Sequence, residues 1–341
     1  MALAEASDVV GGGPAGFARR APPVPSPVFD TYWRFAAERH RIFEARYRGE
    51  AGPWTKDPVL LKHKFTNAFR VNDRASQFLV ARVIGQRVEI SDVFFRVLLF
   101  KFFNRIDTWH LLRDALGEEP TIGSFKLKRY IAIYDRAFAA GQRLYSAAYI
   151  MPMAPGYEER RKHATHLRLL NDLLRARVPE RIAEAKTMGA AFGVLRQWPM
   201  MGEFLAYQYV TDINYSSATD FLETEFVVAG PGALDGIRKC FADYNGYTPA
   251  DIIRWVADRQ ESEFRSRGLD PVRLFGRPLQ FIDCQNLFCE VDKYARVVHP
   301  EVRGRTGRSR IKQLYRANGS PLPYVYPAKW RLAIRKGEKS T

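Results

Sequence analysis

The side chains best suited to chemistry lie within residues 282–296, a stretch without Gly or Pro that predicts a helix. Four polar side chains recur along it at steps of three, four and three residues: Asp283, Asn286, Glu290 and Lys293. This spacing places them on one face of the helix. Such groups are costly to bury unless they pair or take part in chemistry. A solvated polar face with a Glu290–Lys293 ion pair is the alternative interpretation.

The same stretch carries a second polar stripe, formed by Gln285, Asp292 and Arg296. Apolar residues such as Leu287 and Phe288 lie between the two stripes. A surface helix normally has one polar and one apolar face, whereas this helix interleaves the two kinds of residue. Other elements of the chain must therefore supply partners for its polar groups.

The composition indicates a globular chain with a large interior. Of its 341 residues, 46% are apolar and 13% aromatic, which suits one two-lobed unit or two domains. Charged residues interrupt every long apolar run, and residues 1–28 lack the apolar core of a secretory signal, so we expect a soluble, cytoplasmic protein. Three cysteines are too few for a disulfide framework or a four-thiolate metal site, and we expect buried thiols.

The positive charge is concentrated at the end of the chain. The net charge is +16, and residues 296–341 alone carry 12 Lys or Arg against two Glu. Residues 303–312 mix Arg with Gly and Ser, which suits contacts to the phosphates of an anionic polymer. A solubilising basic tail is the alternative. The candidate phosphate-binding side chains are Arg303, Arg305, Arg308, Arg310 and Lys312.

Two patterns that could indicate a cofactor or a metal do not have the required context. Residues 11–16 have the Gly spacing of a dinucleotide-binding turn, but a Pro-rich stretch follows in place of a helix, so we predict no cofactor. His163 and His166 are three residues apart with no third ligand in view, so we predict no metal site.

Further helices are predicted upstream, and they too contain candidate site residues. Residues 64–79 are read as one helix that carries a mixed polar face. Residues 93–112 form a core helix with two pocket candidates at its end, and residues 124–150 form another helix with a tyrosine pair on one face. The candidates on these helices are Asn67, Arg70, Asp73, Arg74, Asn104, Trp109, Tyr145 and Tyr149.

Two glycine-containing turns could bind phosphate through backbone N–H groups. Residues 195–212 predict a helix, a Pro-containing turn with Gly202 and a second helix, which resembles a helix-hairpin-helix. Met200 stands where that hairpin usually has its first Gly. Gly230 and Gly232 precede Arg238 and Lys239 and could form an anion nest, with simple helix punctuation as the alternative.

Together, residues 283–296, 64–74, 100–109, 145–152 and 230–232 resemble an all-helical family. It is the family of α-glutamyl/putrescinyl thymine pyrophosphorylases and of the helical domain of 5-hydroxymethyldeoxyuridine DNA kinases. The resemblance covers residues 29–315 and implies a fold shared with helix-hairpin-helix DNA glycosylases. Some members of the family look like glycosylases that defend bacteria against phages with hypermodified pyrimidines.

Two features depart from these relatives. The chain has no Gly-x-x-x-x-Gly-Lys-Ser/Thr loop, so we do not expect the kinase activity of the family name. Helix-hairpin-helix glycosylases place a catalytic Asp after the hairpin, whereas here that region offers Glu223 or Glu225 and no unambiguous Asp.

The resemblance implies a DNA glycosylase that flips and excises a bulky modified pyrimidine. Asp283 and Glu290 are the candidates for the carboxylate that stabilises the sugar cation, with Asn286 orienting base or water and Lys293 tuning the charge. Asp212 joins the upstream candidates in the base pocket. The alternatives are a transferase that displaces pyrophosphate from an activated 5-hydroxymethyl pyrimidine and a non-catalytic DNA-binding module.

The expected architecture is all-α and two-lobed, in a monomer that binds DNA carrying modified pyrimidines. Lobe one is predicted to combine residues 29–115 with 255–316, and lobe two to comprise residues 116–254, with the site between them. Residues 1–28 are predicted to be a disordered tail and residues 317–341 a basic tail.

Overall fold

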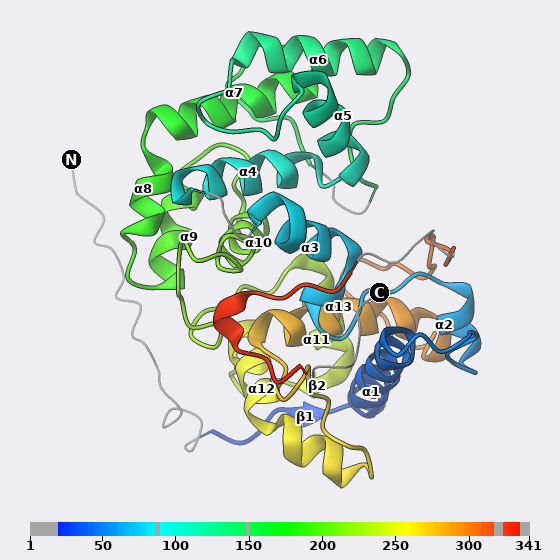
Figure 1. Cartoon of the computed structure of the whole chain (residues 1–341). Helices are drawn as coiled ribbons and strands as arrows, with labels where there is room; N and C mark the ends of the chain where they lie inside the picture. The colour runs from blue at the N-terminus through cyan, green and yellow to red at the C-terminus, as the bar shows by residue number, and fades with distance from the viewer. Residues whose placement is uncertain (1–19, 86–88, 148–150, 317–322, 335–341) are drawn as a thin grey trace, which may run out of the picture.

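The computed structural model describes residues 20–85, 89–147, 151–316 and 323–334, and confirms an all-α fold (Figure 1). No helix within these ranges is long and apolar enough to cross a membrane. The α-helices are α1 (Pro27–Tyr47), α2 (Pro58–Lys62), α3 (Arg74–Phe78), α4 (Ile90–Phe103), α5 (Ile106–Leu116), α6 (Leu127–Ala139), α7 (Lys162–Arg175), α8 (Val178–Ala183), α9 (Met188–Arg196), α10 (Glu203–Ile213), α11 (Pro231–Cys240), α12 (Pro249–Ser266) and α13 (Phe281–Val298). Shorter elements are the 3-10 helices η2 (Arg70–Asn72) and η4 (Ala328–Trp330), the π-helix η3 (Leu79–Ile84), and the strands β1 (Val24–Pro25) and β2 (Phe241–Asp243).

The N-terminal boundary lies earlier than predicted. Residues 20–28, assigned to a disordered tail, have a defined structure: β1 pairs antiparallel with β2, and the side chain of Ser26 caps α1 by accepting a hydrogen bond from Val28 N. Pro27 suits the first helical position because backbone N–H groups in the first turn have no acceptor within the helix, so a residue without an N–H loses no hydrogen bond there. The rest of the predicted tail lies outside the described residues.

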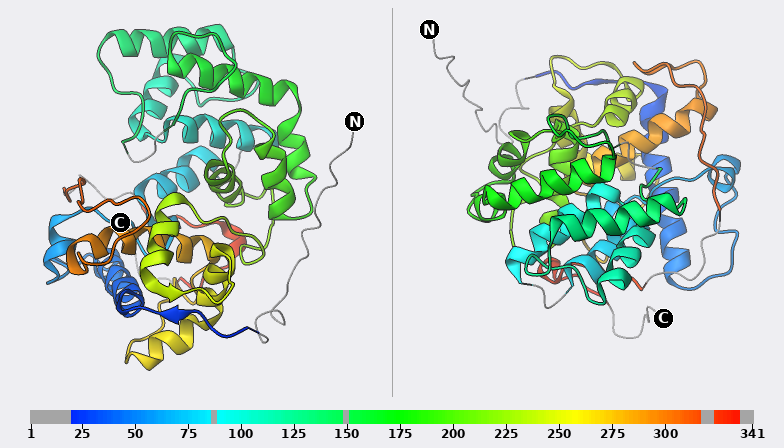
Figure 2. Two further views of the ribbon diagram at one scale, coloured as in Figure 1. Left: turned by 180° about the vertical axis from the view of Figure 1, so that it is seen from behind. Right: turned by 90° about the horizontal axis from the view of Figure 1, so that it is seen from above.

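The helices form an upper group, α4 to α8, and a lower group that includes α1, α11, α12 and α13 (Figures 1 and 2). Their membership corrects the predicted lobes. The helix α4, assigned to lobe one, packs against η3 of that lobe but also against α7, α8 and α10, so it joins the two predicted lobes. The helix α11 was assigned to lobe two but packs against α13 and α1. Both helices bury apolar side chains together with charged ones, Lys101 on α4 and Lys239 on α11, so burial and ion pairing rather than chain order decide which neighbours they take.

Glycines allow α11 and α13 to approach closely. A β-carbon at Gly236 would lie 2.0 Å from the carbonyl oxygen of Phe288, and one at Gly232 would lie 2.3 Å from Sγ of Cys289. A β-carbon at Gly230 would lie 2.5 Å from the ring of Phe204. Close packing therefore accounts for Gly230 and Gly232, which were candidates for an anion nest.

Two predicted helices end earlier than expected. The predicted helix over 93–112 is divided at Asn104, which has a φ of 47° and ends α4 in the left-handed region. The predicted helix over 124–150 ends with α6, and Gly141 with a φ of 75° follows. Tyr145 consequently lies outside any helix, and Tyr149 lies outside the described residues.

Candidate functional site on helix α13

Asp283, in the first turn of α13, holds two backbone N–H groups. Its Oδ2 accepts from Gln280 N at 3.0 Å, which completes a capping box, and its Oδ1 accepts from Arg70 N at 2.7 Å. The side chain is 5% exposed, and burial raises the pKa of Asp283 to about 7 despite both donors. With both oxygens occupied, Asp283 ties the segment of Arg70 to α13.

Glu290, two turns further along α13, accepts a backbone N–H with only one of its carboxylate oxygens. Its Oε2 accepts from Thr66 N at 2.9 Å and pairs with Lys293 Nζ at 2.8 Å. The same ammonium donates to the carbonyl oxygen of Lys64 at 2.8 Å. Within the described part of the chain, Oε1 of Glu290 accepts no hydrogen bond. One oxygen of this fixed carboxylate is thus available to a ligand.

Asn286 lies between the two carboxylates on the same face of α13, one turn from each. It is half-buried, and its side chain forms no hydrogen bond to any residue that the structure describes. Oγ1 of Thr66, on the facing segment, is buried and also without a partner there. Buried polar groups usually find partners, so unsatisfied groups beside Glu290 indicate a place where a ligand or water binds.

The facing segment is not the helix that the sequence predicted. Residues 64–69 are non-helical and are followed by η2 and then α3. Three backbone N–H groups in this region donate to carboxylates: Thr66 N to Glu290, Asn67 N to Asp73 and Arg70 N to Asp283. These N–H groups are therefore not available for helical hydrogen bonds. Tertiary hydrogen bonds to Asp283 and Glu290 of α13 therefore outweigh the local helix propensity of this segment.

The polar face predicted for residues 64–79 divides into three environments. Asn67 donates from Nδ2 to the carbonyl oxygen of Asn72 at 2.8 Å and to Asp73 at 3.2 Å, which closes the segment on itself. Burial raises the pKa of Asp73 to about 6, although the Asn67 N–H opposes the shift. Arg74 is exposed. The side chain of Arg70 points instead into the interior.

Arg70 enters a buried polar cluster where α4, α10 and α13 meet. Its Nη1 lies 2.7 Å from Oδ1 of Asp212, whose Oδ2 lies 3.1 Å from Nζ of Lys101. Burial alone would raise the pKa of Asp212, but the charges of Arg70 and Lys101 hold it below its usual value. Gln208 accepts from Arg70 at 3.0 Å and donates to Gln285 at 3.4 Å. Asp212, predicted in the base pocket, is therefore the anchor of a closed ion network.

Two members of this cluster, Lys101 and Gln208, were not predicted as site residues from the sequence. Both lie within strongly apolar helical stretches, and their side chains are 4% and 1% exposed. A charge or an amide on an otherwise apolar helix is the signal that could have identified them, because such a group needs a buried partner.

The remaining base-pocket candidates lie away from this face. Nε1 of Trp109 donates to Glu119 at 3.1 Å. The hydroxyl of Tyr145 lies 2.9 Å from Nδ1 of His166. Asn104 ends α4, and its Oδ1 is buried without a partner in the described residues. These three positions belong to the packing of α4, α5 and α7.

The histidine pair is engaged with protein groups. Nε2 of His163 lies 3.1 Å from Oδ1 of Asp135, and Nε2 of His166 lies 2.7 Å from the carbonyl oxygen of Pro152. In the described ranges, no group of three or more His, Cys, Asp or Glu side chains is arranged to hold a metal ion.

The two turns predicted to bind phosphate, at Gly202 and at the start of α11, differ in which of their candidate residues are exposed. In the turn between α9 and α10, Met200 has a φ of 67°, and the exposed Gly202 donates its N–H to Met200 O at 2.9 Å. At α11, Arg238 is exposed, but Lys239 is 1% exposed and lies 2.9 Å from Asp292. Lys239 is thus a core ion-pair residue and not a phosphate contact.

The basic segment, residues 303–316, is fixed to the protein at three places, one of them a hydrogen bond of 3.2 Å from Arg296 to the carbonyl oxygen of Arg310. The hydroxyl and N–H of Thr306 donate to Asp235, while Lys64 N donates to Gln313 O and Tyr315 N to Lys62 O, both at 3.0 Å. The orange trace in Figures 1 and 2 runs beside α13 and α2. The five cations predicted to contact phosphate are exposed and form no ion pair with a described residue: Arg303, Arg305, Arg308, Arg310 and Lys312. The same holds for Arg316 at the end of the segment.

The chain beyond residue 322 is also packed, which corrects the predicted basic tail for residues 323–334. The hydroxyl of Tyr326 donates to Asn72 at 3.0 Å, and Nε1 of Trp330 donates to Glu223 at 2.8 Å. The ring of Trp330 lies edge-on to Tyr215 at 5.5 Å. Residues 323–334 therefore contact Tyr215, whose hydroxyl accepts a hydrogen bond from Arg70 of the buried cluster.

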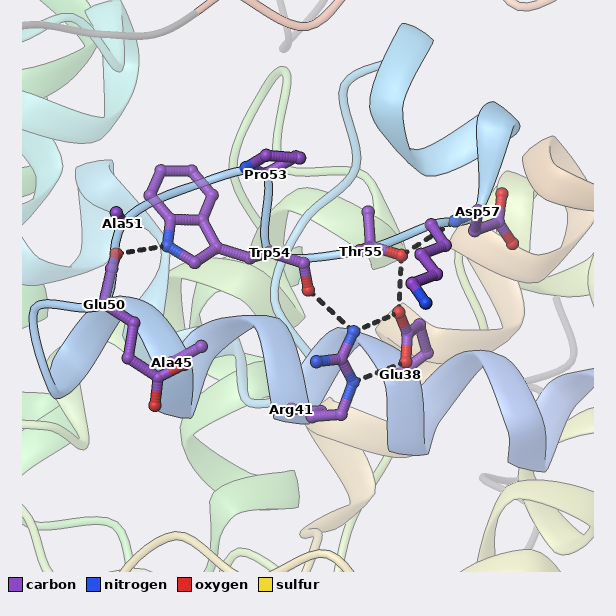
Figure 3. A pocket seen from close by; sticks show the side chains of 10 residues that line it. Glu38, Arg41, Ala45, Glu50, Ala51, Pro53, Trp54, Thr55 and Asp57 are labelled. Atoms are coloured by element: carbon purple, nitrogen blue, oxygen red, sulfur yellow. Dashed lines mark hydrogen bonds and ion pairs between the residues drawn. The ribbon is translucent and has the colours of Figure 1, made fainter.

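A surface cavity of about 450 Å³ lies elsewhere, between α1 and residues 50–57 (Figure 3). Arg41 bonds Glu38 and the carbonyl oxygen of Trp54, and Nε1 of Trp54 donates to Glu50 O at 2.6 Å. No candidate residue from the sequence lines the cavity. Its polar groups largely satisfy one another, so α13 remains the better candidate site.

Comparison with known proteins agrees with this helical architecture. Residues 26–304 match the family described as "5-hmdU DNA kinase, helical domain". The chain belongs to this family. It is also 24% identical over 293 residues to a protein named "5-hmdU DNA kinase" from Bacillus phage SP10. That alignment covers 81% of this chain and 46% of the phage protein, so the chain spans less than half of that relative. No solved structure matches the chain.

Replacing Asp283 by Asn should lower the free energy of unfolding by about 1–3 kcal/mol, because an amide N–H₂ would face a backbone N–H. The folded pKa of about 7 lies above the unfolded value, so the stability contributed by this carboxyl declines as the pH rises toward 7. The deficit of the variant, measured by urea unfolding, should therefore be larger near about pH 5 than near about pH 8. Replacing the exposed Asp270 by Asn is the matched control, and an equal deficit at both pH values would contradict the prediction.

Proposed function

We propose that this protein binds DNA and acts on a modified pyrimidine base, with cleavage of the N-glycosidic bond as the reaction. The observation that carries the proposal is the arrangement around Glu290: one oxygen is fixed by Thr66 N and Lys293, and the other is free beside Asn286. The name of the phage relative suggests the substrate class, a 5-hydroxymethyl pyrimidine in DNA.

The basic segment supports DNA as the partner. Five exposed cations on a segment with fixed ends offer a row of phosphate contacts with little loss of backbone freedom on binding. The row ends at Gln313, which pairs with Lys64, two residues before Thr66. A strand bound along the basic segment would thus pass next to Glu290.

The chemistry assigned to Glu290 follows from its charge and position. As the bond between the base and C1′ of the sugar breaks, the base leaves with the electron pair and positive charge develops on the sugar. A fixed carboxylate stabilises that charge while water attacks C1′, and the proton that the water loses passes to the departing base, so that the products are an abasic sugar and the free base. Lys293 balances the carboxylate in the resting state, and Asn286 has the donor and acceptor needed to orient the base or the water. Asp283 has no free oxygen and serves to position the segment.

Replacing Glu290 by Gln should reduce base release by about 10²-fold or more, because the charge that stabilises the transition state is lost. Affinity for DNA should change little, since a Gln oxygen can still accept the Thr66 N–H. The assay incubates DNA containing 5-hydroxymethyl or bulkier modified pyrimidines and detects abasic sites by alkaline cleavage.

Replacing the exposed Glu301 by Gln is the matched control and should leave base release unchanged. Full activity of the Glu290→Gln variant would contradict the assignment of this residue. Modified DNA that changes mass while its glycosidic bonds stay intact would indicate transfer to the base substituent, and would replace excision as the reaction.

Neutralising Arg303, Arg305, Arg308, Arg310 and Lys312 should weaken binding to modified and unmodified DNA alike. The slope of log affinity against log salt should fall by about one unit for each lost phosphate contact, as counterion release requires. Titration of labelled duplexes at several salt concentrations measures this slope. The control for net charge replaces five other exposed cations at or near α6 and α7: Lys126, Lys128, Arg129, Arg136 and Arg175. An equal effect of both sets would contradict a specific role for the basic segment.

A further inference from the structure

We propose that a nucleobase of bound DNA stacks on Tyr315, at an apolar tip marked by the exposed side chains of Leu61, Leu314 and Tyr315. The inference deepens the proposed function and rests on it for the identity of the partner. It adds a contact to the bases, whereas the cations of the basic segment would contact phosphates only.

The tip is built by backbone pairing between two segments far apart in the sequence. Lys64 N donates to Gln313 O and Tyr315 N donates to Lys62 O, each at 3.0 Å, around an antiparallel bridge between His63 and Leu314. These bonds fix the backbone of the tip at the end of α2. Three large side chains nevertheless remain in solvent, with exposed fractions of 45% for Leu61, 52% for Leu314 and 40% for Tyr315.

The positive charges beside the apolar tip favour a nucleic acid as its partner. Lys62, Lys312 and Arg316 border the tip, are exposed and form no ion pair with a described residue. A protein partner for an apolar surface would not need this density of positive charge, and a membrane would need a larger apolar face. A nucleic acid strand combines flat apolar bases with regularly spaced phosphates, and aromatic side chains beside cations suit both.

The tip is joined to α13 through Lys64, so a base stacked on it would lie near the candidate catalytic residue Glu290. Lys64 joins the two: its N–H bonds the basic segment, and its carbonyl oxygen accepts from Lys293, which pairs with Glu290. Two residues later, Thr66 N bonds Glu290 directly. A base stacked on Tyr315 would therefore hold the strand beside Glu290, next to the nucleotide that is acted on.

The test compares Tyr315→Ala with Tyr315→Phe in the full chain. The probe is a duplex with a 5-hydroxymethyl pyrimidine next to 2-aminopurine, whose fluorescence changes when its stacking changes. We expect Tyr315→Ala to weaken binding by about 5- to 100-fold and to abolish the fluorescence change, because base–aromatic stacking is lost. Tyr315→Phe should retain both, and the salt slope should stay the same in both variants because no charge is removed.

The control is Leu222→Ala, which removes a 60% exposed apolar side chain from another surface and should bind as the unaltered protein does. Binding of Tyr315→Ala within about twofold of the unaltered protein would overturn the stacking surface, as would equal losses in Tyr315→Ala and Tyr315→Phe. Absence of any DNA binding would overturn both the surface and the proposed function. Weakened binding by Tyr315→Ala without base release from any DNA would retain the surface and reject excision.

Discussion

The candidate site depends on the capture of backbone N–H groups by carboxylates of α13. Asp283 holds Arg70 N at 2.7 Å, and Glu290 holds Thr66 N at 2.9 Å. These bonds keep residues 64–69 non-helical and direct the side chain of Arg70 toward Asp212 in the interior. Because a buried ion pair is costly to break once one partner is displaced, the outer segment and the inner cluster stabilise each other.

This arrangement divides roles that the sequence could not separate. Asp283 and Glu290 have the same chemistry and lie on one helix face, but Asp283 has both oxygens engaged and Glu290 has one. The difference arises from capping: Asp283 occupies the third position of α13, where a carboxylate bonds the N-terminal backbone. Glu290 is two turns further along, where no free backbone N–H of the helix competes for it.

The sequence was sufficient for the all-α fold, for α13 with both polar stripes and for the exposed cations of the basic segment. It was insufficient wherever tertiary contacts decide local structure. Residues 64–79 have a helical pattern, but carboxylates of α13 take up the N–H groups of Thr66 and Arg70, and Asn104 ends a helix within a stretch whose helical pattern continues beyond it. Lys239 is followed by Cys240 and looks like a surface cation, yet its partner Asp292 lies 53 positions away in the chain.

The most direct test of this account is hydrogen–deuterium exchange of residues 64–72, compared between the unaltered protein and Asp283→Asn. The account predicts slow exchange of the Arg70 and Thr66 amides in the unaltered protein. In the variant, exchange should become much faster in this segment and remain unchanged in α6 and α7, which are far from α13. Equal protection of Arg70 in both proteins would contradict the account, because the non-helical segment would then be held by something other than the carboxylates of α13.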